Sequence, residues 1–285
     1  MGGTTIQQFT TKLIKELNGF YPKNEIRQFS KLMLEHILNV STTQLLMMNF
    51  EMLNEQQLNH LEQMTTKLKQ HIPIQYIIGE TVFYDLCFKV NPSVLIPRPE
   101  TEELVDWIIK EQKGKLTKLL DIGTGSGCIA LSLKANMPVI EITAWDISID
   151  AIATAKTNAE KLNLDIIFKQ VDVLNFKVGT EKFDCIVSNP PYVRELEKEM
   201  MESNVVEHEP HTALFVSNND PLLFYRTIAQ IGQQMLQPKG FLYFEINEFL
   251  AEDMTEMLSH LGYSNIECRK DINGRNRMMK AVLAN

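Results

Sequence analysis

Long apolar segments are missing from this chain of 285 residues. No uninterrupted apolar run approaches the roughly 20 residues that a membrane-spanning helix needs. The first residues, from Met1 to Thr11, also lack the apolar core of a secretory signal peptide. We therefore expect a cytoplasmic protein with no membrane contact. Since 44 % of the residues are hydrophobic, the chain has enough apolar side chains to build the cores of a globular fold.

Cysteine is scarce and scattered. The four cysteines, Cys87, Cys128, Cys185 and Cys268, form no Cys-x-x-Cys pair, and no histidine lies near them at the spacing of metal ligands. Three of them occur in apolar or glycine-rich stretches, where we expect small buried side chains. The pattern indicates neither a disulfide framework nor a structural zinc, and we expect no metal.

Positive charge is in the minority. The chain has 28 lysine and arginine residues against 36 aspartate and glutamate residues, a formal net charge of -8. Such a protein repels a polyanion, so we expect no direct contact with nucleic acid. No coiled-coil seam or obvious apolar interface is visible, which favours a monomer.

Glycine and proline are almost absent from the first part of the chain. Apolar residues recur there at helical spacing, as in Phe9, Leu13 and Leu17. Ser41 and Asn54 stand where helix N-caps are expected. Residues 1–72 are therefore expected to form a small helical domain.

The periodicity changes at Pro73. Residues 75–79 and 82–90 are interpreted as short β segments separated by turns, which predicts a β-hairpin linker over residues 73–95. From residue 96 to 285, predicted strands and helices alternate, for example a strand at 118–122, a helix at 128–135, a strand at 139–146 and a helix at 149–162. This alternation predicts an α/β fold with a doubly wound, largely parallel sheet that helices cover on both faces.

A glycine-rich turn follows the first predicted strand of this region. The strand ends in Asp121 and leads into Gly123-Thr124-Gly125-Ser126-Gly127. The glycines allow a sharp turn and bring backbone N–H groups close to a ligand. Asp146 closes the next strand, where a carboxylate can accept hydrogen bonds from both ribose hydroxyls of a nucleotide. Together they indicate a nucleotide-type cofactor site, although the glycines alone are also compatible with a tight turn that binds nothing.

NAD, ATP and S-adenosyl-L-methionine all fit this much of the pattern. The loop has no Gly-Lys-Ser/Thr to supply a phosphate-binding lysine, which argues against ATP. Asp121 would repel a pyrophosphate but suits the ammonium group of a methionine tail, so S-adenosyl-L-methionine fits better than NAD. Asp172, at the end of a third strand, is a candidate contact for the adenine, with a surface turn carboxylate as the alternative. We expect S-adenosyl-L-methionine as cofactor and S-adenosyl-L-homocysteine as product.

A second motif, Asn189-Pro190-Pro191-Tyr192, follows the buried strand predicted at 183–188. It therefore leaves the carboxyl edge of the sheet, where open α/β sheets bind ligands. The two prolines make the loop stiff. The side-chain oxygen of Asn189 and the main-chain oxygen of Pro190 could accept both hydrogens of one NH₂ group, while Tyr192 offers a face for the flat group that carries it. Fixing a poorly nucleophilic amide nitrogen in this way favours methyl transfer to it without a general base.

With these motifs in place, the chain resembles the PrmC/HemK family of protein-(glutamine-N5) methyltransferases. The likeness covers nearly the whole chain and includes residues 73–79, 94–102 and 207–214 besides the two motifs. It implies a class I methyltransferase Rossmann-like fold behind a helical domain that reads the partner. It also implies methylation of the glutamine in the Gly-Gly-Gln motif of class-1 peptide release factors. By this resemblance Gly123 to Gly127, Asp146 and Val173 line the cofactor, and Asn189 to Tyr192 hold the glutamine amide. We expect Asn189 to contact the cofactor as well.

The chain departs from the family pattern after the strand predicted at 241–246. The family shows Glu-Ile-Gly and a nearby glutamine where this chain has Glu245-Ile246-Asn247 and Leu250.

Asn-Pro-Pro-Tyr also occurs in enzymes that methylate adenine N6 of DNA, so a nucleic-acid base is the alternative substrate. A catalytically silent cofactor-binding adaptor and a helical domain that only stabilises the fold are further alternatives. Glu100 and Glu102 are interpreted as helix N-terminal carboxylates, while Arg98 either faces the substrate or pairs with an acid.

Overall fold

The computed structural model describes residues 3–177 and 179–284. Its contacts divide the chain into two compact units, residues 1–79 with 203–208 and residues 80–202 with 209–285. The contact-based division falls after Gly79, and the domain boundaries that the sequence predicts at residues 72 and 95 stay predictions.

The first unit is helical. It contains α1 (Ile6–Glu16), α2 (Lys23–Leu38), α3 (Thr42–Met47), α4 (Glu55–Leu68), α5 (Ile74–Ile78) and α9 (Ser203–His208). Thr5, Ser41 and Asn54 form capping boxes at the starts of α1, α3 and α4, so the two N-caps expected from the sequence are confirmed. The helices bury one core, to which the predicted Phe9, Leu13 and Leu17 belong.

The prediction of a strand at residues 75–79 is wrong, because Ile74–Ile78 form helix α5 and Gly79 ends it. A short apolar run has no periodicity that separates a strand from a buried helical turn. Pro73 stands at the N-cap, and Gly79 ends the helix in the left-handed conformation at φ +84°. The hairpin itself is confirmed: β1 (Glu80–Phe83) and β2 (Leu86–Lys89) pair antiparallel. Its two turn residues both have positive φ, which suits the twist of a two-residue hairpin turn.

The second unit is built on a seven-stranded sheet in the order β10-β11-β9-β6-β3-β4-β5. The bounds are β3 (Lys118–Ile122), β4 (Glu141–Asp146), β5 (Ile167–Gln170), β6 (Phe183–Ser188), β9 (Leu236–Glu245), β10 (Tyr263–Lys270) and β11 (Asn276–Leu283). The strands from β9 to β5 are parallel, and β11 joins them to β10 by antiparallel pairing. The fold expected from the sequence is confirmed, and β11 and β10 make the sheet mixed.

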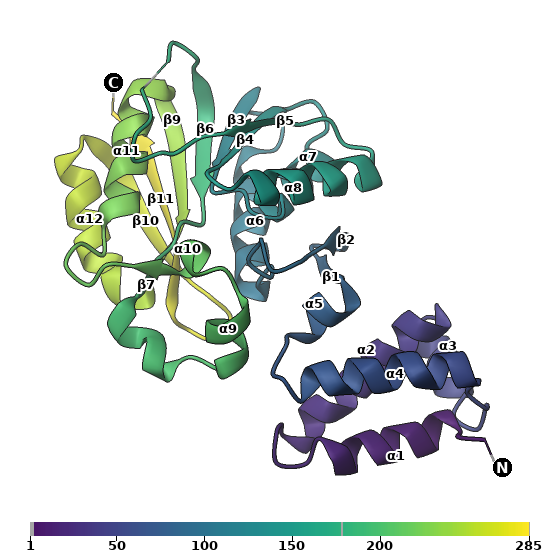
Figure 1. Ribbon diagram of the computed structural model, residues 1–285. Helices are drawn as coiled ribbons and strands as arrows, with labels where there is room; N and C mark the ends of the chain where they lie inside the picture. The colour runs from purple at the N-terminus through teal and green to yellow at the C-terminus, as the bar shows by residue number, and fades with distance from the viewer. Residues whose placement is uncertain (1–2, 178, 285) are drawn as a thin grey trace. The chain divides into compact units, whose positions relative to one another are not determined.

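Helices cover both faces of this sheet (Figure 1). One face packs against α6 (Pro99–Gln112), α7 (Cys128–Asn136) and α8 (Ile149–Leu162), and the other against α11 (Leu223–Met235) and α12 (Ala251–His260). Along β3, Leu119 belongs to the first core and Leu120 to the second. Alternate side chains therefore enter opposite cores, which explains why the strand is apolar throughout. The remaining short elements are β7 (Val193–Arg194), η1 (Glu195–Met200), α10 (His211–Leu214), β8 (Phe215–Val216) and η2 (Glu248–Leu250).

The cysteines are all free thiols, and only Cys185 is buried. Cys87 and Cys128 are half-buried and Cys268 is exposed, so the expectation of three buried thiols is only partly met. In residues 3–177 and 179–284, no three histidine, cysteine, aspartate or glutamate side chains are grouped as metal ligands. Over the same residues, none of the helices combines the length and apolarity needed to cross a membrane.

Candidate active site

The two sequence motifs meet at the carboxyl edge of the parallel strands. In the register of β3 and β6, Ile122 lies opposite Ser188, whose hydroxyl donates to the Ile122 carbonyl at 2.6 Å. The next residues, Gly123 and Asn189, are therefore neighbours. A Cβ atom built on Gly123 would lie 3.9 Å from the carbonyl oxygen of Asn189. The structure thus brings together the glycine-rich loop and the Asn-Pro-Pro-Tyr segment.

The glycine-rich loop needs its glycines. Gly123, Gly125 and Gly127 have φ values of +75°, +55° and +82°, a conformation that residues with a Cβ atom rarely adopt. The N–H groups of Gly123 and Thr124 both donate to the Trp145 carbonyl, at 2.8 and 2.9 Å. These bonds hold the loop against the end of β4.

Gly127 and Ser126 serve the packing beneath the loop. A Cβ atom on Gly127 would meet a Leu131 methyl at 3.0 Å and the Ala155 methyl at 3.3 Å. Ser126 is buried, and its carbonyl accepts from the Asn158 amide at 2.9 Å. These two residues hold α7 close to α8, while Gly123 is exposed at the site.

Asp121 is a buried carboxylate under the loop. Its Oδ2 accepts from the Thr124 hydroxyl at 2.7 Å, while its Oδ1 has no hydrogen-bond partner among the described residues. Burial raises the pKa of Asp121 to about 7, with a smaller contribution from the charge of Asp146, whereas the Thr124 hydroxyl opposes the shift. A buried oxygen without a partner is costly unless a ligand or water satisfies it. An ammonium group is a suitable partner for such an oxygen.

Asp146 ends β4 beside the loop. Its Oδ2 accepts from the Gly125 N–H at 2.8 Å and its Oδ1 from the Ser148 N–H at 2.9 Å. Burial raises the pKa of Asp146, and these N–H groups oppose that shift. Each oxygen of a carboxylate can accept a second hydrogen bond, so Asp146 retains the capacity to bind ribose hydroxyls.

Asp172 and Val173 follow β5 on the far side of Asp146. The Asp172 carboxylate accepts from the Leu174 N–H at 3.0 Å and from the Asn175 amide at 2.7 Å, so it stabilises its own turn. Val173 is half-buried and packs against the second core. The turn-forming role that was the alternative for Asp172 is therefore present, and its contact with adenine stays a proposal.

The Asn-Pro-Pro-Tyr segment is held by residues that the sequence analysis did not select. The Tyr192 hydroxyl donates to Glu245 Oε1 at 2.8 Å, and the Thr101 hydroxyl donates to Glu245 Oε2 at 2.5 Å. Arg277 Nη1 lies 3.4 Å from the Tyr192 hydroxyl. Asn189 Nδ2 lies 3.4 Å from the Thr101 hydroxyl. Pro190 is buried, and Asn189 and Pro191 are half-buried.

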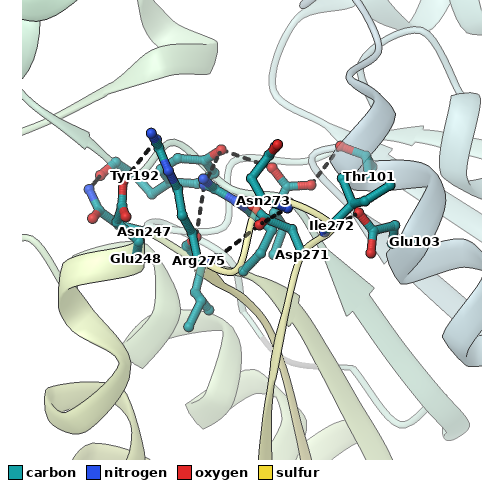
Figure 2. A network of polar contacts seen from close by, with 12 residues as sticks. Thr101, Glu103, Tyr192, Asn247, Glu248, Asp271, Ile272, Asn273 and Arg275 are labelled. Atoms are coloured by element: carbon teal, nitrogen blue, oxygen red, sulfur yellow. Dashed lines mark hydrogen bonds and ion pairs between the residues drawn. The ribbon is translucent and has the colours of Figure 1, made fainter.

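Four segments distant in the sequence contribute to this network. Figure 2 shows Thr101, Tyr192 and Asn247 gathered around the tip of the β10–β11 hairpin. Asp271 braces that tip, because its Oδ1 accepts from the Asn273 and Arg275 N–H groups at 2.9 and 3.0 Å. Its Oδ2 accepts from Arg277 at 3.3 Å. One signal in the sequence could have pointed here: Glu245 is a charged residue directly after the apolar run at 241–244.

The departure at Asn247 is accommodated in the structure. Its φ is -65°, so glycine is not required there. The Asn247 amide donates to the Tyr192 carbonyl at 3.1 Å and to the Glu197 carboxylate at 3.0 Å. Its side-chain oxygen accepts from the Phe249 N–H at 3.0 Å, and Leu250 is buried in the core. Asn247 therefore ties the segment after Tyr192 in place.

Three charged residues lie before and in the first turn of α6. Arg98 donates to Glu209 at 2.6 Å, and the Glu209 carboxylate also accepts from the Ile96 N–H at 3.1 Å. Arg98 thus pairs with an acid, one of the two alternatives expected for it. Glu100 and Glu102 lie in the first turn of α6, and Glu102 accepts from the Tyr84 N–H at 2.9 Å.

Comparisons with known proteins agree with this architecture. Residues 101–214 match the Methyltransferase small domain family, and residues 11–79 match the PrmC N-terminal domain family. The release factor glutamine methyltransferase of Flavobacterium psychrophilum is 45 % identical over 279 residues, which cover 96 % of this chain and 98 % of that protein. The enzyme of the same name from Bacteroides thetaiotaomicron is 43 % identical over 277 residues, 97 % of this chain and 99 % of that protein.

Among solved structures, a methyltransferase from Pyrococcus furiosus aligns with a TM-score of 0.56 and 18 % identity. The alignment covers 77 % of this chain and all of that chain, a likeness that concerns the fold alone. The two curated relatives are similar over nearly their full length, and residues 11–79 and 101–214 each match a family domain. The chain belongs to the PrmC/HemK family of release factor glutamine methyltransferases.

Proposed function

We propose that this protein transfers a methyl group from S-adenosyl-L-methionine to the side-chain nitrogen N5 of the glutamine in the Gly-Gly-Gln motif of class-1 peptide release factors. The observation that carries the proposal is the contact between the glycine-rich loop and Asn189 at one sheet edge. We call the segment Asn189 to Tyr192 the amide clamp. The cofactor loop and the amide clamp must be adjacent if a methyl group is to pass directly from the cofactor to the substrate.

The cofactor would be held by residues at the ends of β3, β4 and β5. The unpaired oxygen of Asp121 suits an ammonium group, Asp146 suits ribose hydroxyls, and the loop Gly123-Thr124-Gly125-Ser126-Gly127 gives close backbone approach. Asp172 and Val173 would lie on the adenine side. When bound, S-adenosyl-L-methionine supplies an electrophilic methyl group attached to a positively charged sulfur.

The substrate amide would be held by the Asn-Pro-Pro-Tyr segment. Asn189 Oδ1 and the Pro190 carbonyl would each accept one N–H of the glutamine NH₂ group, with Pro191 stiffening the loop and the Tyr192 ring facing the amide plane. Positive charge grows on nitrogen as it attacks, so two fixed acceptors bind the transition state more tightly than the substrate. The nitrogen can lose its proton after attack, so no basic side chain is needed at the start.

The release factor would be recognised by the whole protein, and the helical first unit would be the main recognition domain. Its match to the PrmC N-terminal domain supports this role. We propose a monomer in the cytoplasm that binds the release factor directly and does not bind nucleic acid. The net charge of -8 agrees with that choice.

Transfer of labelled methyl groups tests the function. The protein is incubated with methyl-labelled S-adenosyl-L-methionine and with a release factor, with its Gln→Ala variant at Gly-Gly-Gln, or with duplex DNA. We expect label on the intact release factor only, and loss of that label with Asn189→Ala while the Kd for the cofactor stays within about threefold. Label on DNA would instead support methylation of a base, and label on nothing would leave a cofactor-binding adaptor.

A further inference from the structure

Glu245 is a buried carboxylate behind the proposed amide clamp. It ends β9 and is 1 % exposed. Its Oε2 accepts from the Thr101 hydroxyl at 2.5 Å and its Oε1 from the Tyr192 hydroxyl at 2.8 Å. Burying a carboxylate is costly, and burial raises the pKa of Glu245, whereas the Thr101 and Tyr192 hydroxyls and the charge of Arg277 oppose that shift and favour the ionised form. The carboxylate therefore contacts Tyr192 directly and reaches Asn189 through Thr101.

The direction of the bond at Tyr192 is fixed by Arg277. The guanidinium Nη1 lies 3.4 Å from the Tyr192 hydroxyl, and a guanidinium can only donate. The Tyr192 oxygen therefore accepts from Arg277, and its single hydrogen is directed to Glu245. The Tyr192 hydroxyl lies between the Glu245 carboxylate and the Arg277 guanidinium, and these two contacts fix the orientation of the ring.

The direction of the bond at Thr101 then decides how the Asn189 amide is turned. The Thr101 hydrogen is committed to Glu245, so its oxygen can only accept a further hydrogen bond. Asn189 Nδ2 lies 3.4 Å from that oxygen. If the amide were flipped, Oδ1 would face an oxygen with no hydrogen between them. The amide nitrogen is thus held against Thr101, which leaves Oδ1 for the substrate.

We infer that Glu245 is a positioning residue that acts through Thr101 and Tyr192 to present Asn189 Oδ1, rather than Nδ2, to the substrate. This inference rests on the proposed function of the clamp. It also explains a choice of substrate: an acceptor oxygen at this point binds the NH₂ group of glutamine and repels the carboxylate of glutamate.

The isosteric substitution Glu245→Gln reverses the pattern. If the new NH₂ group faced Tyr192, that hydroxyl would accept from both Arg277 and Gln and its own hydrogen would be left without an acceptor. The arrangement that satisfies every group places the NH₂ against Thr101. The Thr101 hydrogen is then free to donate to Asn189 Oδ1, so the Asn189 amide turns over and offers Nδ2 to the substrate.

The experiment compares four variants of the full-length protein: Glu245→Gln, Thr101→Val, Thr101→Ser and Tyr225→Phe. Tyr225 is the matched control, since its hydroxyl donates to the main-chain oxygen of Glu245 at 3.3 Å and accepts from the Asn247 N–H at 3.2 Å, two main-chain contacts that do not involve the Glu245 carboxylate. We measure kcat and KM with the release factor, the Kd for S-adenosyl-L-methionine and the melting temperature. We expect kcat to fall about 10- to 100-fold for Glu245→Gln and Thr101→Val, while the Kd for the cofactor stays within about twofold. Thr101→Ser, which keeps the hydroxyl, should recover most of the loss.

A second readout does not need the substrate. The side-chain NH₂ resonances of Asn189, identified by their absence in Asn189→Ala, report the hydrogen bond to Thr101. We expect slower hydrogen exchange in the wild type than in Thr101→Val, and a changed chemical shift in Glu245→Gln.

The outcomes separate the two proposals. A wild-type protein that methylates no release factor sinks the proposed function, and the resonances of Asn189 still decide the positioning. An unchanged kcat for Glu245→Gln, or Thr101→Ser as impaired as Thr101→Val, overturns the inference. So does a loss of activity matched by an equal loss of cofactor binding, because Glu245 would then be only structural.

Discussion

Gly123 lies next to the main-chain carbonyl of Asn189. A Cβ atom added to Gly123 would be 3.9 Å from that carbonyl oxygen. The two residues follow neighbouring parallel strands, and each opens one of the two motifs. The loop proposed for the cofactor and the loop proposed for the substrate therefore meet through main-chain atoms, in a space that glycine leaves open.

Gly123→Ala tests that space. At φ +75° an added Cβ atom is strained, which should lower the free energy of unfolding by about 1–2 kcal/mol. Gly114→Ala is the matched control, since it has φ +79° and nothing within 4 Å of the added atom. We expect similar destabilisation in both, but a Kd for S-adenosyl-L-methionine about tenfold weaker only in Gly123→Ala. Equal binding by titration calorimetry would show that the methyl group does not reach the ligand.

Asp121→Asn tests the buried carboxylate. Because the folded-state pKa of Asp121 is about 7 and the unfolded-state pKa is about 3.9, the folded protein binds the extra proton between these values. Stability without cofactor should therefore fall as pH rises from about 4 to 7, by up to about 1.4 kcal/mol per pH unit from this group. Asn cannot ionise, so the wild type should lose stability relative to Asp121→Asn as pH increases, and the two proteins should be most alike near pH 4. Parallel pH profiles would mean that Asp121 is already ionised at low pH.

Arg98→Met tests the ion pair with Glu209. The Glu209 side chain is 1 % exposed, so removal of its partner leaves a buried charge and should cost about 3 kcal/mol in unfolding by urea. Adding Glu209→Gln should restore part of the stability, since a neutral amide costs less to bury. A double variant less stable than Arg98→Met would show that Glu209 has other essential contacts.

Asn247→Gly introduces the residue typical of the family. The substitution removes the bonds to the Tyr192 carbonyl, to Glu197 and to the Phe249 N–H, and should lower the free energy of unfolding by about 2 kcal/mol. Asn163→Gly is the contrasting control, because Asn163 ends α8 at φ +54°, where glycine is favoured and the change should be neutral or stabilising. Identical effects in thermal unfolding would show that the Asn247 side chain contributes nothing here.

Local signals explain the elements that could be predicted from the sequence. The predicted helix at 149–162 and the predicted strand at 183–188 have the same bounds as α8 and β6. Ser148 caps α8 at one end, and Asn163 ends it in a left-handed conformation at the other. The strand prediction for residues 75–79 failed because four of the five residues of α5 are apolar, and such a run has no periodicity that distinguishes a helical turn from a strand.

The positions of the site loops could also be predicted, because the carboxyl ends of parallel strands share one edge. The residues behind them could not. Thr101 and Glu245 are 144 positions apart, and nothing local in either segment predicts that their side chains meet. Sequence motifs identify the groups proposed to touch the ligands, whereas the side chains that orient those groups depend on long-range packing.

The wide sequence separation of the Glu245 contacts has a consequence for the order of folding. The loop after Asp121 is completed by bonds to β4 over 21 and 22 positions, while the network behind Asn189 needs closures of 144, 88 and 85 positions. Closing longer loops costs more entropy and slows folding. We expect refolding protein to bind S-adenosyl-L-methionine before it gains methyl transfer, as stopped-flow refolding with both readouts would detect. During refolding, the number of protein molecules that bind the cofactor would then exceed the number that can transfer a methyl group.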